Sequence, residues 1–253
     1  MTEARPRPAL DSLRARIARI ESSGRIRRAV LPFGVDAIDA RLPGGGLALG
    51  ALHEVAGGGS GAVDGAAAAL FAAGIVARIP GLVLWCVTRP DLFAPAIQQA
   101  GLDPDRVIYV EAGDEPTVLA CFEEGLRHGG LAGVIAEVAR LSMTSSRRLQ
   151  LAAETSGTTG IAVRRWRRVT EATDFGQPTA ATTRWRVTAM PSSPLPVPGV
   201  GRARWFVELI RSRAGECAEF VLEACDEEGR LALPADLADR SAAPPAGRRR
   251  ASA

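Results

Sequence analysis

The sequence predicts an α/β fold: a mostly parallel sheet with helices on both faces and an antiparallel C-terminal extension. A continuous apolar run, typical of a strand buried on both faces, occurs at residues 82–87, and residues 131–138 are expected to form another buried strand. Stretches with helical periodicity lie between such runs, so strands and helices alternate along the chain. After residue 163 apolar and polar residues alternate instead, as in antiparallel strands.

The chain opens with basic, proline-rich residues 1–8, which we expect to be disordered. Leu10, Leu13, Ile17 and Ile20 then recur at spacings of three and four residues, with arginines between them. This is the pattern of a short amphipathic helix. Its apolar face either packs on the protein's own core or docks on a partner, and the pattern fits both. Residues 1–30 are therefore treated as a basic N-terminal arm.

The α/β region follows from residue 31. We expect strands at residues 52–56, 82–87, 106–110, 131–138 and 160–163. Helices are expected between them, at residues 62–78, 115–128 and 145–155.

The antiparallel extension is expected to contain strands at residues 183–190, 204–211 and 219–224. Residues 170–181 and 191–201 are rich in Thr, Pro, Ser or Gly and are expected to be loops. Residues 31–240 then form one domain, and residues 241–253 form a disordered tail that is rich in arginine.

The glycine-rich turn after residue 56 is the most informative motif. It reads Gly57-Gly58-Gly59-Ser60-Gly61-Ala62-Val63-Asp64. A phosphate loop reads G-x-x-x-x-G-K-[ST]: backbone amides surround the phosphates, the lysine contacts their oxygens and the hydroxyl binds Mg²⁺. Gly57 matches the first position, whereas Ala62, Val63 and Asp64 replace the second glycine, the lysine and the hydroxyl residue. The whole chain contains no lysine that could substitute.

Asp64 strengthens this interpretation. If a helix starts near residue 63, its first amides and its dipole favour an anion, and Asp64 can supply that anion from within the chain. A bound triphosphate would then meet a carboxylate and be repelled. We therefore predict a degenerate nucleotide-binding loop (Gly57, Ser60, Gly61, Ala62, Val63 and Asp64) in a protein that is not an enzyme and uses no cofactor. The alternative is a glycine-rich turn that was never a phosphate loop.

Residues 31–225 resemble the RecA-type ATPase core, a P-loop NTPase fold, and most closely the ImuA family. Residues 31–39 (LPFGVDAID), 42–47 (LPGGGL) and 50–55 (GALHEV) resemble the lead-in to the recombinase phosphate loop. Residues 147–154 (RRLQLAAE) and 156–160 (SGTTG) are similar to the signature helix and strand of ImuA proteins. Residues 204–209 (RWFVEL) and 220–223 (FVLE) also fit that family.

The resemblance implies an SOS-induced accessory factor of mutagenic translesion synthesis that lacks intact ATPase motifs. Its implied partners are ImuB, a catalytically inactive relative of Y-family polymerases, and an error-prone replicative-type DNA polymerase, with RecA as a further candidate. By the same resemblance the second acidic position falls on Glu137, which could hold Mg²⁺ as an aspartate does. The water-activating glutamate would fall near Thr88 and Arg89, where no carboxylate occurs before Asp91.

Three tryptophans are flanked by arginines, in the segments 164–168 (RRWRR), 184–186 (RWR) and 202–205 (RARW). Arginine can contact phosphates while indole stacks on a base, so single-stranded DNA is one candidate ligand. Acidic protein surfaces are another. Ordinary strand alternation, with Trp185 facing a core and its neighbouring arginines facing solvent, is the third explanation. The candidate contacts are Arg164, Arg165, Trp166, Arg167, Arg168, Arg184, Trp185 and Arg186.

Composition excludes several classes of function. Four cysteines without C-x-x-C spacing and two histidines do not support a metal site or a cysteine nucleophile. No apolar run reaches the roughly 20 residues of a membrane span, so we expect a cytoplasmic protein that associates with the nucleoid after DNA damage. Two alternative functions stay open: a DNA-stimulated ATPase of the recombination-mediator type and a SulA-like inhibitor of cell division.

Overall fold

The computed structural model describes residues 29–59, 61–166, 175–192, 195 and 197–234. The expected helix with Leu10, Leu13, Ile17 and Ile20 lies outside these described residues, as does the tail at 241–253. The same is true of Ser60, Arg167 and Arg168.

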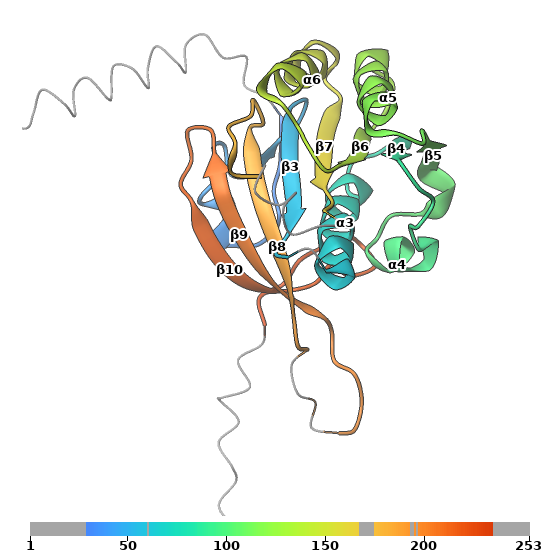
Figure 1. Cartoon of the computed structure of the whole chain (residues 1–253). Helices are drawn as coiled ribbons and strands as arrows, with labels where there is room; N and C mark the ends of the chain where they lie inside the picture. The colour runs from blue at the N-terminus through green and yellow to red at the C-terminus, as the bar shows by residue number, and fades with distance from the viewer. Residues whose placement is uncertain (1–28, 60, 167–174, 193–194, 196, 235–253) are drawn as a thin grey trace, which may run out of the picture.

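An eight-stranded sheet with the order β10-β9-β8-β3-β7-β6-β4-β5 forms the centre of the fold (Figure 1). From β8 to β5 each strand is parallel to its neighbours, whereas β8, β9 and β10 pair antiparallel. The predicted α/β fold with an antiparallel C-terminal extension is therefore confirmed. The strands are β3 (Leu52–Gly57), β4 (Val83–Val87), β5 (Val107–Glu111), β6 (Gly133–Val138), β7 (Thr159–Arg164), β8 (Thr183–Met190), β9 (Arg204–Ser212) and β10 (Ala218–Glu223).

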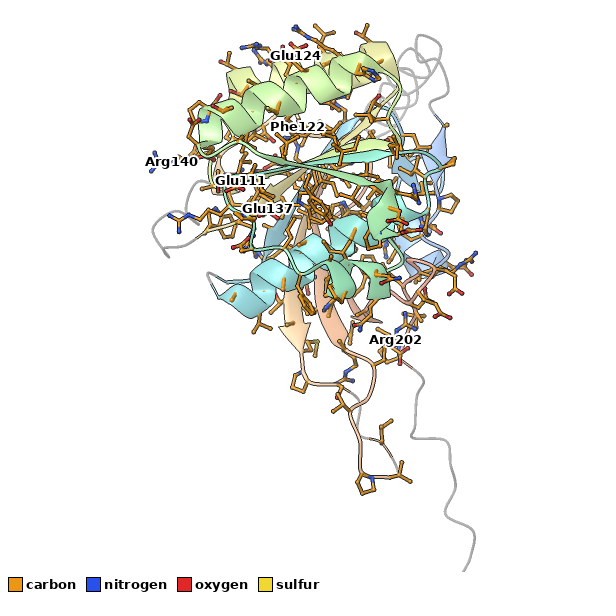
Figure 2. The ribbon with its side chains drawn as sticks, turned by 90° about the vertical axis from the view of Figure 1, so that its right-hand side faces the viewer. Glu111, Phe122, Glu124, Glu137, Arg140 and Arg202 are labelled. Atoms are coloured by element: carbon orange, nitrogen blue, oxygen red, sulfur yellow. The ribbon has the colours of Figure 1, made fainter. Side chains whose placement is uncertain are left out.

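Helices cover both faces of the sheet, as predicted. Helix α3 (Ala62–Ala77) packs against β3, β7 and β8 on one face, and α5 (Glu115–His128) and α6 (Met143–Ser156) lie on the other (Figure 1). Figure 2 shows Phe122 pointing from α5 to the sheet and Glu124 pointing away from it. Short elements that the sequence did not indicate complete the fold: β1 (Val30–Leu31), α2 (Asp36–Asp39), β2 (Leu47–Ala48), α4 (Ala94–Gln99) and the 3₁₀ turn η1 (Pro104–Arg106).

Caps explain where α5 and α6 begin and end. The Asp114 carboxylate accepts a hydrogen bond from the Thr117 amide at 2.8 Å, and the Ser142 hydroxyl accepts one from the Ser145 amide at 3.0 Å. Both helices end at a glycine in the left-handed conformation, Gly129 (φ 74) and Gly157 (φ 79). Side-chain caps of this kind satisfy amides that the helix itself leaves unpaired. Because Ser142 is the cap, α6 starts at Met143, two residues before the predicted start.

The two larger hydrophobic cores of the described residues lie on the two faces of the sheet, and a small third cluster contains Ala56, Trp166 and Phe175. The core under α3 contains an aromatic cluster centred on Phe71. The centroid of the Phe71 ring lies 6.0 Å from that of Phe33, 5.6 Å from that of Trp185 and 6.2 Å from that of Trp205. The core under α5 and α6 is built around Phe122, Leu126 and Leu149. Alanine fills much of the buried face of α3, which lets this helix lie close to the strands.

Phe71→Ala tests the aromatic cluster. Removing the buried ring leaves a cavity among three other rings, so we expect the free energy of unfolding to fall by about 3–5 kcal/mol, measured by chemical denaturation. The matched control is Val63→Ala on the same helix. Val63 is 69% exposed, and its truncation should change stability by about 0.5 kcal/mol or less. Equal effects of the two variants would contradict the assigned packing.

Candidate functional site

A pocket of ≈ 550 Å³ lies at the carboxyl ends of the parallel strands, beside the first turn of α3. Ligands of open α/β sheets bind at this edge. The glycine-rich loop, Glu137 and the chain after β7 converge there. The lining residues are Gly57, Gly59, Gly61, Ala62, Gly65, Thr88, Arg89, Asp91, Gly113, Asp114, Glu115, Glu137, Val138, Ala139, Arg164, Arg165 and Trp166.

The described part of the glycine-rich loop lies against β8. The Gly58 amide donates a hydrogen bond to the Val187 carbonyl at 3.0 Å. A Cβ at Gly58 would lie 1.9 Å from the Thr188 hydroxyl oxygen, and one at Gly57 would lie 2.8 Å from the backbone of Asp64. Glycine is required at both positions because the loop approaches its neighbours so closely. Because the Gly58 amide donates to Val187, it already has a hydrogen-bond partner within the chain.

Asp64 lies in the first turn of α3, as expected, but its carboxylate has another partner than the helix amides. The carboxylate accepts a hydrogen bond from the Ala189 amide of β8 at 3.0 Å. The N-cap residue of α3 is Gly61, so no side chain caps the start of this helix. Asp64 therefore joins α3 to β8. Val63, at the position of the phosphate-loop lysine, is exposed and does not line the pocket.

Arg165 occupies the acidic side of the pocket. Its guanidinium contacts Glu137 (Nη1–Oε2, 2.5 Å) and both carboxylate oxygens of Asp91 (2.7 and 3.0 Å). Trp85 Nε1 donates to the other oxygen of Glu137 at 3.2 Å. Glu137 is buried near the carboxyl end of β6, and Figure 2 labels it close to Glu111, the last residue of β5. The two carboxylates nearest to the predicted magnesium and water-activating positions are thus both paired with a cation of the same chain.

The pKa values of this cluster follow from burial and charge. Burial raises the pKa of Glu137, although the charge and hydrogen bond of Arg165 and the Trp85 hydrogen bond oppose the change. Burial by itself would lower the pKa of Arg165, but its contacts with Asp91 and Glu137 outweigh that effect and raise it above the usual value. Arg165 is therefore a permanent positive charge inside the pocket.

The residues present do not fit a magnesium–triphosphate complex. The lysine is absent, Asp64 stands where the metal-binding hydroxyl would be, and Arg165 contacts the acidic residue that would face the metal. Asp114 and Glu115 add further negative charge to the lining. No group of three His, Cys, Asp or Glu residues in the described part of the chain is arranged to hold a metal ion.

Arg165→Gln tests the coupling between Arg165 and Glu137. Glu137 stays buried but loses the cation that lowers its pKa, so its pKa should rise further. The measurement is a pH titration of glutamate carboxyl carbons by NMR. Arg186→Gln, which removes an arginine paired with Glu208, should leave the pKa of Glu137 unchanged. A pKa of Glu137 that falls or stays constant in Arg165→Gln would contradict the pairing.

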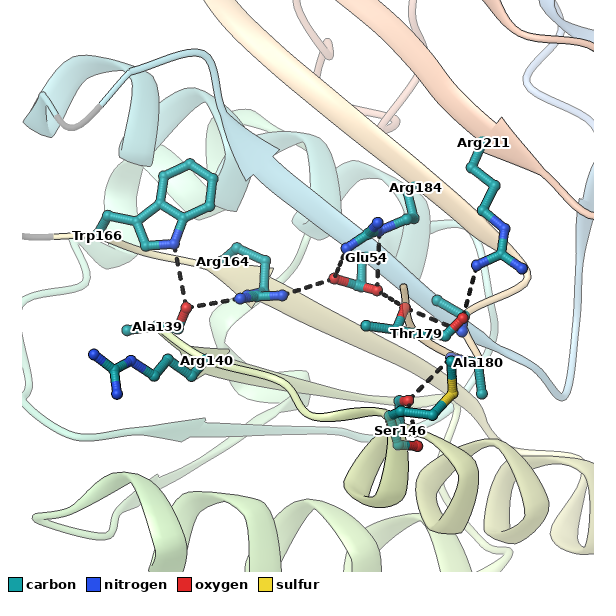
Figure 3. Close-up of polar contacts among 12 residues, drawn as sticks. Glu54, Ala139, Arg140, Ser146, Arg164, Trp166, Thr179, Ala180, Arg184 and Arg211 are labelled. Atoms are coloured by element: carbon teal, nitrogen blue, oxygen red, sulfur yellow. Dashed lines mark hydrogen bonds and ion pairs between the residues drawn. The ribbon is translucent and has the colours of Figure 1, made fainter. Parts of the chain in front are cut away.

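A second polar cluster lies on one face of the sheet, around the buried carboxylate of Glu54 on β3 (Figure 3). Arg164 of β7 pairs with it at 2.9 Å and Arg184 of β8 at 3.2 Å. The Thr179 hydroxyl also donates to Glu54. Arg164 additionally donates to the Ala139 carbonyl at 2.8 Å, which links β7 to the loop after β6. The cluster thus joins three neighbouring strands and two loops.

The structure does not support the prediction that Arg164, Arg184 and Trp185 form a contact surface. Arg164, Arg184 and Trp185 are buried, so as folded they offer no surface to DNA or a partner. Strand alternation is confirmed for Trp185, but Arg184 faces Glu54 and the Phe175 ring (4.7 Å to the centroid) instead of solvent. Arg186 is partly exposed and pairs with Glu208 at 3.2 Å.

Trp166 is also turned inward. Its Nε1 donates to the Ala139 carbonyl at 3.2 Å, and its ring packs edge-on against Phe175 at 5.5 Å. Trp205 belongs to the aromatic core under α3. The described tryptophans are therefore structural.

Glu54→Gln tests the buried cluster. Without the carboxylate, two arginines remain buried next to a neutral amide, and the free energy of unfolding should fall by about 3–5 kcal/mol. The comparison variant is Glu208→Gln, which removes a partly exposed pair and should cost about 1 kcal/mol or less. Both values come from urea denaturation, and a neutral Glu54→Gln would contradict the role assigned to the cluster.

Sequence reasoning missed Glu54, Phe175 and the pairing of Asp91 with Arg165. Glu54 carries a usable signal: a lone carboxylate in the apolar strand Leu52–Gly57 must be paired if the strand is buried. Its partners lie 110 and 130 positions away, so no local pattern identifies them.

Fold and site together define a RecA-like domain whose phosphate-loop positions are substituted. No family model matches the chain. It is 39% identical over 245 residues to Protein ImuA of Caulobacter vibrioides strain NA1000 / CB15N, and equally to Protein ImuA of strain ATCC 19089 / CIP 103742 / CB 15. Each alignment covers 91% of this chain and 99% of the relative. The chain therefore belongs to the ImuA family, as its motifs predicted.

Proposed function

We propose that this protein is a non-catalytic, RecA-like accessory factor of damage-induced mutagenic translesion DNA synthesis. The observation that carries the non-catalytic part is the Arg165 guanidinium, which pairs with Glu137 and Asp91 at 2.5 and 2.7 Å. In an ATPase a carboxylate at the position of Glu137 would hold Mg²⁺, and Asp91 is the first carboxylate after the empty water-activating position near Thr88 and Arg89. With an internal cation between them and no lysine in the chain, neither role is open, and the protein is a pseudo-ATPase.

Membership of the ImuA family supports the remainder of the proposal. The proposed partners are an ImuB-like relative of Y-family polymerases and an error-prone replicative-type polymerase, with RecA as a further candidate. Such a factor works through contacts: its RecA-like body and its basic termini bring other proteins together. The site of action is the cytoplasm, at the nucleoid after DNA damage. None of the helices in the described ranges is long and apolar enough to cross a membrane.

Direct binding of single-stranded DNA receives less support than protein contacts. Bases stack on exposed aromatic side chains. The tryptophans of the arginine-flanked segments, Trp166, Trp185 and Trp205, are all buried, and the exposed aromatic side chains Phe93 and Tyr109 lie outside those segments. Arginines that contact phosphates must also be free of acidic partners, whereas Arg164, Arg165 and Arg184 are paired.

The frequency of damage-induced mutants in a deletion strain tests the proposal. The full-length gene should restore induced mutants without changing cell length. Val63→Lys should restore them equally well, because Val63 is exposed and outside the pocket.

Survival and cell length are scored in the same cultures. Unchanged mutagenesis together with lost filamentation would contradict the accessory role and favour a division inhibitor. If Val63→Lys is present at the wild-type level but fails to restore mutagenesis, the non-catalytic model is contradicted.

A further inference from the structure

A separate groove of ≈ 400 Å³ lies between α6, the chain that leads into β8 and the end of β9. One wall is a stripe along α6, and the other is the chain just before β8 together with the end of β9. The lining residues are Met143, Arg147, Gln150, Leu151, Glu154, Thr179, Ala180, Arg211 and Arg213. None of them lines the pocket near Arg165, so the groove is a different site.

The two walls are held in place by hydrogen bonds (Figure 3). The Ala180 amide donates to the Ser146 hydroxyl of α6 at 2.9 Å, and Arg211 donates to the Thr179 carbonyl at 2.7 Å. Gln150 accepts a hydrogen bond from the Leu52 amide at 2.8 Å, which ties α6 to β3. The groove is therefore preformed, and a ligand would not have to order it.

The groove is positively charged. Arg147, Arg211 and Arg213 line it, and none of the three forms an ion pair with a carboxylate in the described part of the chain. Glu154 is the single carboxylate among the described lining residues, and the Gln150 side-chain amide donates to it at 2.6 Å. Three arginines facing one occupied carboxylate attract an anionic ligand.

The α6 wall of the groove also carries apolar side chains. Leu151, one turn from Arg147 on α6, is 64% exposed, and Met143 lies one turn further toward the start of the helix. No aromatic side chain lines the groove on which a base could stack. An exposed leucine among arginines that have no carboxylate partner in the described ranges suits a ligand that has both carboxylates and an apolar side chain.

We propose that this groove binds an acidic segment of a partner protein. An apolar side chain of that segment would lie on Leu151 and Met143, while its carboxylates contact Arg147, Arg211 and Arg213. Nucleic acid fits less well, because the groove offers phosphate contacts without a stacking surface. The proposal concerns the groove alone and stands whether or not the protein acts in translesion synthesis.

Fluorescence anisotropy on the full-length protein tests this proposal. The probes are a labelled peptide that alternates Glu or Asp with Leu, a peptide of equal charge with Gly in place of Leu, and a single-stranded oligothymidylate. The protein should prefer the leucine-containing peptide. Arg147→Glu combined with Arg213→Glu should weaken its binding about tenfold or more, because two attractions become repulsions. Leu151→Ser should remove the preference for leucine over glycine.

Arg140→Glu is the matched control, since Arg140 is an exposed arginine that points away from the groove (Figure 3). It makes the same charge change per residue and should leave peptide binding unaltered. All of these positions are on the surface, and circular dichroism verifies folding. Equal losses in the control and groove variants would overturn the proposal. So would oligothymidylate binding tighter than the peptide and sensitive to the groove variants.

Discussion

The buried carboxylate of Glu54 joins three central strands of this protein, β3, β7 and β8. Arg164 and Arg184, from the strands on its two sides, both pair with it away from solvent. Removing such a charge from water is costly, so the carboxylate must keep its partners. Because side chains on a strand alternate between the two faces, Arg164 beside Glu54 places Arg165 on the opposite face, toward α3 and Glu137. The buried pair thus positions the arginine that occupies the pocket.

The pocket that results differs from an ATPase site in the origin of its cation. An ATPase receives Mg²⁺ together with its nucleotide, and its carboxylates are free to hold the metal. Here the cation is the side chain of Arg165, which directly follows β7, so every molecule carries it. Asp64 reinforces the difference, since it bonds β8 at the place of a metal-binding hydroxyl. The protein has the sheet and the glycine-rich turn of an ATPase, but its charged side chains at this site, such as Arg165 and Asp64, bond to other parts of the same chain.

The sequence predicted the fold well because its signals are local. Apolar runs identified the central strands, and the glycine-rich turn located the start of α3. The site was predicted less well. Strand alternation suggested that Arg184 faces solvent, whereas it faces Glu54, because pairing between β3 and β8 is a long-range contact. The roles of Asp91 and Arg165 likewise depend on two strand ends that meet only in the folded sheet. Burial of a charged residue is a property of its partners, and those are distant in the chain.

Isothermal titration of the full-length protein with Mg·ATP, with and without single-stranded DNA, tests the central claim most directly. The claim is that Arg165 fills the cation position of the pocket. It predicts no heat of binding at millimolar nucleotide and no phosphate release. Saturable binding, or turnover that single-stranded DNA stimulates, would contradict it and support an ATPase of the recombination-mediator type.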